Sequence, residues 1–432
     1  MHPSLCKGSY LCKKMDKKLT LEIIQEVMQW AEQYKDCSVD RLLLGSNEVP
    51  QELKSLVATQ IEVGKKWKRK YPSLSEKPFF FPKGVNFEQA SSEATAHFKS
   101  HFVASSDTLV DLTGGAGIDF LAMSANAQKA YYIERDPSLA TALKFNLQPF
   151  VQRLPPLSIC TNDAVNFLDL VDTGEHTLLY CDPSRRTDSG RRTFLLEEIS
   201  PNPQEILRNL QDSNKSFSLL LKLSPLIDLQ ALMESLPSIS KIYILAVQGE
   251  VKEILALIPD VHSPLKLPAE EIALEAVELS AMGEIQKNFS LTFAEEKKAC
   301  IHYTDTIKKY IYYPAPSLLK IGAFKRVAEY YGLDALHPNS HLYTGDHFEG
   351  DFYGSIFLVK ETLPYSKSKL KQLRKAYPKA DFTVRNFPLS APELCRQTGI
   401  SSCTTTRIFA TTIMPAKPLF IITEPITNQT LI

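Results

Sequence analysis

The fold is decided by the stretch Leu109-Val-Asp-Leu-Thr-Gly-Gly-Ala-Gly-Ile-Asp119, an apolar run that passes into a glycine-rich turn and then into a helical pattern. The apolar run ends at an acid, Asp111. Glycines allow a backbone to approach a ligand closely, and the first turn of a helix offers free N–H groups. The stretch therefore predicts a strand, a ligand-binding turn and a helix.

The turn suits either a dinucleotide or S-adenosylmethionine, the methyl donor. The dinucleotide fingerprint G-x-G-x-x-G fails here: after Gly115 and Gly117, position 118 is Ile and position 120, where the third glycine belongs, is Phe. An acid at the end of the strand, followed by Gly115 and Gly117, fits the methyl-donor version, in which a carboxylate faces the cationic amino-acid end of the ligand. The glycines alone are a weak signal, and the acids that follow strengthen it.

From about residue 107, short apolar runs alternate with amphipathic segments. This alternation is typical of a parallel sheet covered by helices on both faces. We expect strands at 108–112, 130–134, 157–160, 178–181, 217–223 and 241–247, and helices at 118–128, 138–148, 163–171, 203–211, 226–236 and 250–258. Two further strands, 272–280 and 288–293, follow without a helix between them, so we expect an antiparallel pair at that edge.

More candidate site residues lie where the predicted strands end, since open α/β sheets bind ligands at the carboxyl edge. Glu134 ends the second strand, where a carboxylate can hold a ribose. Asp163 follows the third strand and could accept an adenine N–H, although capping of helix 163–171 explains it equally well. Asp136 is better interpreted as an N-cap, because Pro137 suits the first helical position.

The fourth strand ends in Asp182-Pro-Ser-Arg-Arg186, which places an acid and two arginines at the same edge. Arginine can hold phosphate or carboxylate through two parallel hydrogen bonds. A turn-capping role for Asp182 and a solvated charge run are the alternatives. The fifth strand likewise ends near Lys222, for which snorkelling at a sheet edge is the alternative.

Helices are predicted before the α/β region. Thr20 is a candidate N-cap for the first helix, and a second helix starts near Pro50. Residues 54–83 hold eight Lys or Arg and only two acids, Glu62 and Glu76. A solvated helix face or a phosphate-binding surface would explain this stretch.

A second, smaller α/β unit is predicted after a boundary near residues 295–315. We expect a helix at 317–331, strand 354–361, helix 367–376, strand 381–386, helix 391–398 and strands 406–413 and 418–423. Residues 366–385 carry seven Lys or Arg and one acid, Asp381, which makes a second local basic surface.

The composition limits the function classes. The 49 Lys and Arg balance the 49 Asp and Glu, which excludes a globally cationic nucleic-acid binder. The eight cysteines form no C-x-x-C pair, and His337, His341 and His347 match no zinc spacing, so we expect no metal site. The sequence has no apolar run of about 20 residues, which predicts a cytoplasmic protein that contacts no membrane. Whether the chain starts at Met1 or Met15 stays open.

These motifs resemble those of class I S-adenosylmethionine-dependent methyltransferases, in residues 111–117, 132–137, 162–164 and 182–186. Residues 88–99 resemble the helical segment that helps to cover the cofactor in this group. Residues 318–324, 337–343 and 386–394 resemble bacterial methyltransferases that end in a THUMP-like domain preceded by a ferredoxin-like insert. The resemblance spans residues 85–424. It implies a Rossmann-like α/β fold in four parts: an N-terminal helical region (1–84), a methyltransferase domain (85–280), a small ferredoxin-like connecting segment (281–325) and a THUMP-like α/β domain (326–432).

The resemblance also implies roles for individual residues. Asp111 and the turn would hold the methionine moiety, Glu134 the ribose and Asp163 the adenine; the turn comprises Thr113, Gly114, Gly115 and Gly117. The methyl-transfer site would contain Asp182, Pro183, Ser184 and Arg185. Base-amine methyltransferases usually have a proline and an aromatic at the last two of these positions, so stacking of a flipped base is unsupported here and the target atom stays open.

The function expected from these features is methylation of RNA, with phosphates held by Arg186, Lys222, Lys367, Lys371 and Arg374. One alternative is a methyltransferase that acts on a protein or a small molecule. Another is a non-catalytic RNA-binding adaptor that retains the cofactor pocket. The sequence identifies neither the RNA, nor a protein partner, nor the oligomeric state.

Overall fold

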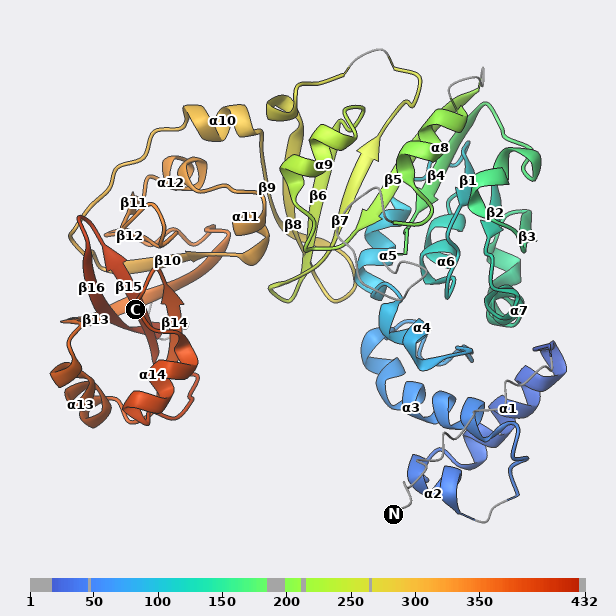
Figure 1. Ribbon diagram of the computed structural model, residues 1–432, viewed down its shortest axis with the longest axis horizontal. Coiled ribbons are helices and arrows are strands. Elements are labelled where there is room, and N and C mark those ends of the chain that lie inside the picture. The colour runs from blue at the N-terminus through green and yellow to red at the C-terminus, as the bar shows by residue number, and fades with distance from the viewer. Residues whose placement is uncertain (1–17, 46–47, 185–198, 211–214, 264–265, 427–432) are drawn as a thin grey trace, which may run out of the picture. The chain divides into compact units, whose positions relative to one another are not determined.

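Figure 1 shows a computed structural model of the protein, which describes residues 18–45, 48–184, 199–210, 215–263 and 266–426. The chain divides into two compact units. Unit 1 comprises Met1–Asp182 and Ser213–Phe217, and unit 2 comprises Pro183–Asp212 and Ser218–Ile432. The candidate start residues Met1 and Met15 lie outside the described residues.

Unit 1 opens with three helices, α1 (Leu21–Gln33), α2 (Val39–Leu44) and α3 (Lys54–Lys70). Thr20 caps α1 as predicted, because its hydroxyl accepts the N–H of Ile23 at 3.3 Å. The apolar residues of α1 follow the helical period and pack with α3 and with Ala142 and Phe145 of α7 (Pro137–Asn146). This packing fixes the N-terminal helices to the α/β part of unit 1.

The strands of unit 1 are parallel and lie in the order β3-β2-β1-β4. Their bounds are β1 (Thr108–Asp111), β2 (Lys129–Ile133), β3 (Leu157–Cys160) and β4 (His176–Cys181). The accompanying helices are α4 (Gly84–Gln89), α5 (Glu93–Ser100), α6 (Ile118–Ser124) and α7, with 3-10 turns η1 (Gln148–Arg153) and η2 (Ala164–Asp169). Since the strands are parallel, their carboxyl ends meet at one edge.

The first strands and helices of unit 2 continue this α/β pattern. The strands lie in the order β5-β7-β6-β8-β9, with β5 crossing the unit boundary. The bounds are β5 (Ser216–Leu223), β6 (Lys241–Val247), β7 (Glu250–Ile258), β8 (Ala273–Leu279) and β9 (Ile285–Leu291), with α8 (Pro203–Leu210), α9 (Leu229–Ser235) and η4 (Ala269–Glu271). The pair β8 and β9 is antiparallel, as predicted.

Two predicted helices are wrong. Residues 250–258 form strand β7, because Gln248 and Gly249 both adopt positive φ (53° and 74°) and turn the chain back along β6. A short apolar run fits a strand or a helix equally well, and the tight turn decides between them. The helix predicted at 317–331 is two helices, α11 (Pro316–Lys320) and α12 (Lys325–Tyr331), separated at Gly322 with φ of 74°.

A seven-stranded sheet forms the C-terminal part of unit 2, in the order β11-β12-β10-β13-β16-β15-β14. The strands are β10 (Tyr310–Pro314), β11 (Asp334–Ala335), β12 (Tyr343–Gly345), β13 (Gly354–Pro364), β14 (Asp381–Arg385), β15 (Arg407–Ile413) and β16 (Lys417–Pro425). Helices α13 (Lys367–Ala376) and α14 (Ala391–Thr398) have the predicted bounds and share an apolar core with β15 and β16, and α10 (Phe293–Lys298) precedes the sheet.

The architecture is therefore mixed α/β with a separate C-terminal α/β domain, as predicted. The four domain bounds proposed from the sequence stay predictions. In the part of the chain that the structure describes, no helix is long and apolar enough to cross a membrane.

Candidate functional site

Asp111 ends β1 as a buried carboxylate. It is 1% exposed, and its Oδ1 atom accepts the N–H of Thr113 at 3.0 Å. Burial raises the pKa of Asp111 well above its usual range; the hydrogen bond from Thr113 opposes this rise, and the negative charges of Asp119, Asp182 and Glu134 add to it. A bound cation would relieve this repulsion, so the residues fit a ligand that carries an ammonium or sulfonium charge.

Side-chain hydrogen bonds tie the ends of β1, β2 and β4 together. Glu134, directly after β2, accepts the N–H of Gly115 at 2.9 Å and the N–H of Asp136 at 2.8 Å. Thr113 accepts the N–H of Asp182, directly after β4, at 2.6 Å through its hydroxyl. The structure thus brings the predicted turn and its acids together at one sheet edge.

The glycines of the turn are needed for packing as well as for backbone freedom. A Cβ atom at Gly114 would lie 2.0 Å from the ring of Tyr132, and one at Gly117 would lie 2.3 Å from Leu143. Gly117 has φ of 80° and Gly115 has φ of 54°, a region that favours glycine. A side chain at position 114 or 117 would therefore disturb the turn itself.

Asp163 and Asp136 are both helix caps. Oδ1 of Asp163 accepts the N–H of Val165 at 3.0 Å, and Oδ1 of Asp136 accepts the N–H of Ser138 at 2.8 Å. Capping was one of the two interpretations of Asp163 and the preferred interpretation of Asp136. Asp163 is exposed, so its other oxygen is accessible to a ligand.

A buried ion pair lies beside this edge and was not predicted. Lys99 of α5 is 0% exposed, and its ammonium lies 3.0 Å from Oδ1 of Asp119, in the first turn of α6. Tyr180 of β4 donates its hydroxyl to Oδ2 of Asp119 at 2.6 Å. The ammonium also lies 5.8 Å from the centroid of the Tyr180 ring. Lys99 therefore offsets the charge of Asp119, one of the carboxylates that raise the pKa of Asp111.

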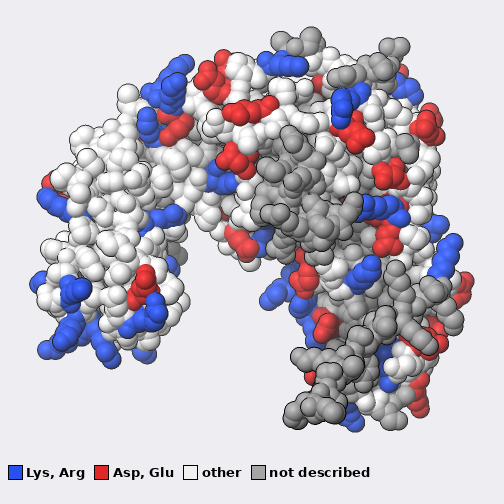
Figure 2. All heavy atoms as spheres, viewed as in Figure 1, with Lys and Arg blue, Asp and Glu red and all other residues white. Residues whose placement is uncertain are grey.

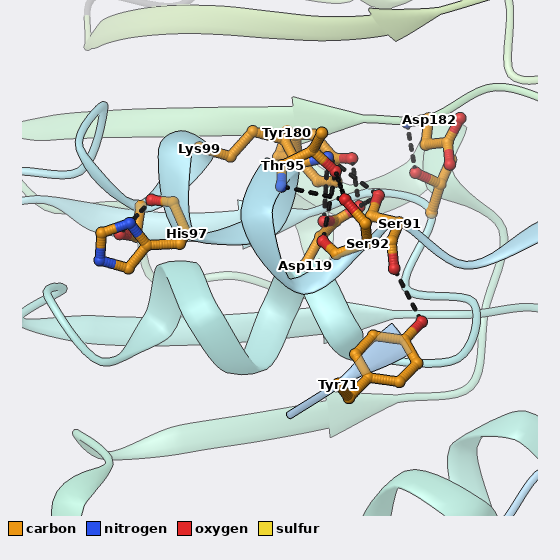
Figure 3. Close-up of polar contacts among 11 residues, drawn as sticks. Tyr71, Ser91, Ser92, Thr95, His97, Lys99, Asp119, Tyr180 and Asp182 are labelled. Atoms are coloured by element: carbon orange, nitrogen blue, oxygen red, sulfur yellow. Dashed lines mark hydrogen bonds and ion pairs between the residues drawn. The ribbon is translucent and has the colours of Figure 1, made fainter. Parts of the chain in front are cut away.

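Ser91 extends this network (Figure 3). Its hydroxyl donates to Oδ2 of Asp119 at 2.7 Å and accepts from the ammonium of Lys99 at 2.9 Å. Its carbonyl accepts the hydroxyl of Tyr71 at 2.7 Å. The network joins the segment before β1 to the helix that follows the glycine turn.

Known protein families and one solved structure are similar to this chain, the families over parts of it and the structure over most of its length. Residues 19–63 match a family model described as "N-terminal domain in putative methyltransferase", residues 310–352 match a ferredoxin-like domain, and residues 354–425 match a THUMP domain-like model. The crystal structure of a "putative methyltransferase from Porphyromonas gingivalis W83" is 35% identical, with a TM-score of 0.84, over 95% of this chain and 100% of that chain. The chain belongs to this methyltransferase family.

Other solved structures match a smaller part of the chain. An rRNA methylase from Streptococcus thermophilus is 15% identical over 38% of this chain and 94% of that chain, with a TM-score of 0.27. A "putative methyltransferase" from Streptococcus mutans in complex with SAH is 14% identical over 39% of this chain and 96% of that chain, with a TM-score of 0.28. No curated protein matches.

Of the remaining predicted site residues, those that the structure describes belong to unit 2. Pro183 is buried, and Ser184 exchanges backbone hydrogen bonds of 2.7 and 3.1 Å with Ser200. Arg185 and Arg186 lie outside the described residues. Lys222 is half-buried in β5, opposite Leu255 of β7, and exposed positions of α13 hold Lys367, Lys371 and Arg374.

The sequence held one signal for the missed ion pair. Lys99 is a charged residue in a segment whose other members, such as Ala94, Ala96 and Phe98, are typical of a buried helix. Its partner Asp119 is 20 positions away, so pairing them requires knowledge of how α5 packs on α6.

Proposed function

We propose that this protein transfers a methyl group from S-adenosylmethionine to RNA. The observation that carries the proposal is the buried carboxyl group of Asp111, which ends a strand at a glycine turn and feels the negative charges of three further carboxylates. Membership of a methyltransferase family and the match of residues 354–425 to a THUMP-like model support it.

The donor, when bound, supplies an activated sulfonium methyl group. The carboxylate of Asp111 would accept a hydrogen bond from the ammonium group of the donor. Each oxygen of Glu134 already accepts one backbone N–H and can accept a second hydrogen bond, here from a ribose hydroxyl. Asp163 would accept an adenine N–H with the oxygen that does not cap η2.

Asp182 would orient the acceptor atom. Its backbone N–H is held by Thr113, so the residue has a fixed place next to the glycine turn. Transfer from an activated sulfonium needs correct positioning more than a strong base. Pro183, Ser184 and Arg185 stay proposed members of the transfer site, and Arg186 and Lys222 stay proposed phosphate contacts.

The exposed face of α13 would hold RNA phosphates. The opposite face of this helix is buried and holds Leu370 and Leu373. Lys and Arg side chains gather over α13, at the lower left of Figure 2. Four cations of α13 form no ion pair with any residue that the structure describes. They are Lys367, Lys371, Arg374 and Lys375. Such a face suits a polyanion without selecting a base.

Calorimetry and nucleoside analysis test the proposal. We expect S-adenosylmethionine to bind the wild type and the Asp169→Asn control, which alters an exposed acid, and to bind Asp111→Asn much more weakly. RNA from cells without the protein should lack one methylated nucleoside that RNA from normal cells contains. Equal donor affinity in Asp111→Asn, or identical nucleosides in both RNA samples, would overturn the corresponding half of the proposal.

A further inference from the structure

The C-terminal sheet of unit 2 curls so that its two edge strands approach each other. Strands β11 and β14 stand at opposite ends of the strand order. Yet Asn386 directly follows β14 and His337 shortly follows β11, and the side-chain N–H of Asn386 donates to Nδ1 of His337 at 3.0 Å. Arg385, at the end of β14, donates to the hydroxyl of Tyr313 on β10 at 2.8 Å. Three segments distant in sequence therefore meet at one place.

Arg385 is a half-buried cation at this place. Its guanidinium carbon lies 5.2 Å from the centroid of the Tyr313 ring. No acid in the described part of the chain forms an ion pair with it. A cation–π contact and one hydrogen bond satisfy only part of a guanidinium, which has five N–H donors. The group is therefore suited to an anion, and its planar fork matches the oxygens of a phosphate.

The two histidines add hydrogen-bond donors. Nδ1 of His337 accepts N–H groups from both Asn386 and the backbone of Asn339, so the neutral ring carries its proton on Nε2. Burial lowers the pKa of His341, and the positive charge of Arg385 lowers it further, which places these two groups within electrostatic reach. The ring of His341 has no hydrogen-bond partner among the residues described.

The backbone of the cluster is held in an unusual conformation. His341 and Asn386 have φ of 51° and 49°, and only one other residue of the described chain that is not glycine has a positive φ. The ring of His341 stacks on Phe324 with centroids 3.8 Å apart and planes at 17°. Strained residues of this kind persist where the surrounding structure fixes them, and they are frequent at ligand sites.

We infer that Arg385, His337 and His341 form a binding site for a phosphate group of a nucleotide, with the stacked Phe324 and His341 rings as a platform for its base. Arg385 would hold two phosphate oxygens, and Nε2–H of His337 a further oxygen. The identification of the nucleotide as part of RNA rests on the proposed function. The site is separate from the exposed cations of α13, and neither the family matches nor the solved structures assign it.

The test uses the full-length protein and two probes, inorganic phosphate and a fluorescein-labelled single-stranded RNA of twelve nucleotides. Arg385→Gln should weaken RNA binding about tenfold or more, because a charge-assisted hydrogen bond is lost. Arg385→Lys should restore part of it, and Arg396→Gln, which alters an exposed arginine of α14, should bind as the wild type does. Circular dichroism checks that each variant folds.

A measurement on the wild type does not depend on a variant's folding. In nitrogen-15 spectra of labelled histidines, inorganic phosphate should shift the ring signals of His337 and His341 and leave that of exposed His302 in place. Wild-type RNA affinity in Arg385→Gln, or unshifted His337 and His341 signals, would overturn the inference. A protein that shows the phosphate shifts but transfers no methyl group would overturn the proposed function and support this site.

Discussion

The protein has two strongly charged regions, and they differ in burial. At the edge of the sheet in unit 1, the negative charges of Asp119, Asp182 and Glu134 help to raise the pKa of Asp111, and the buried Lys99 pairs with Asp119. The cations of α13 lie on a solvent-exposed face. In the first region Asp111 and Lys99 are buried and the other carboxylates are half-buried, whereas the cations of the second region face water.

This difference sets how much one side chain matters. Two unit charges 4 Å apart interact by about 1 kcal/mol in water and by about 4 kcal/mol near a protein surface of lower effective dielectric. Changes at the carboxylate cluster should therefore have large effects that depend little on salt. Changes on α13 should have small, additive effects that fall with salt.

Removing the buried cation should have the largest effect. Lys99→Met leaves Asp119, whose side chain is only 11% exposed, without its counter-charge, and we expect unit 1 to lose about 3–5 kcal/mol of stability. Urea unfolding followed by tryptophan fluorescence measures this, since both tryptophans of the chain, Trp30 and Trp67, lie in unit 1. The double variant Lys99→Met, Asp119→Leu should recover part of the loss. A loss below about 1 kcal/mol in the single variant would mean that water reaches the pair.

Asp111→Asn should come next and should act on binding rather than on folding. We expect donor affinity to fall about 10- to 100-fold, since a charge-assisted hydrogen bond is lost. The pKa of Asp111 is raised in the folded protein, which means that folding favours the protonated carboxyl group. In the free protein, the stability gained from this group is therefore present at low pH and is lost as pH rises through the raised pKa. At neutral pH the asparagine variant should therefore melt no lower than the wild type. A lower melting temperature would show that the carboxylate stabilises the turn.

The same raised pKa predicts the pH dependence of donor binding. As pH falls through the folded pKa of Asp111, which lies well above the usual range, the carboxyl becomes neutral and no longer attracts a cation. Donor affinity should fall with it, and Asp111→Asn should bind the donor with a flatter pH profile. Calorimetry over a pH series checks this. Parallel profiles in the two proteins would assign the titration to another group.

The exposed face should respond to salt. Reversing the charges of Lys367, Lys371 and Arg374 together should reduce the slope of log affinity for RNA against log salt by about 2. The same reversal of Lys65, Lys68 and Arg69 on α3 should do less, because this basic stretch is partly structural: Lys66 pairs with Glu88 at 2.6 Å, and Lys54 donates to the carbonyl of Gly45. A larger effect from α3 would move the RNA surface to the N-terminal helices.

The smallest effect is expected from one exposed cation. Lys371→Ala should weaken RNA binding about twofold to fivefold at low salt and have no measurable effect at high salt. Fluorescence anisotropy at two salt concentrations measures this. A loss as large as that of the triple reversal would mean that Lys371 lies in a specific, partly desolvated contact rather than on a diffuse surface.

Local sequence signals predicted most of the fold. Strands 157–160 and 241–247 and helices 367–376 and 391–398 have the predicted bounds, because turn residues, caps and apolar periods agree there. Strand β7 was missed, since its helical or extended form depends on the turn at Gln248 and Gly249. The acids of the candidate site were predicted because strand ends can be recognised in sequence.

What the sequence could not provide was tertiary packing. The need for glycine at 114 comes from the ring of Tyr132, a neighbour only in the folded sheet. The partnership of Lys99 with Asp119 and Tyr180 needs the contact of α5 with α6 and β4. The meeting of Arg385 with Tyr313 needs the curl of the C-terminal sheet. Each motif was visible alone, and its neighbours were not.

The central claim is methyl transfer from S-adenosylmethionine to RNA, and incorporation of label measures it most directly. The purified protein would be incubated with donor labelled in its methyl group and with total RNA from cells that lack the protein. We predict that label enters RNA with the wild type, and that Asp182→Ala reduces turnover about 100-fold while donor affinity stays within a few-fold. Donor binding without any label in RNA would contradict the account.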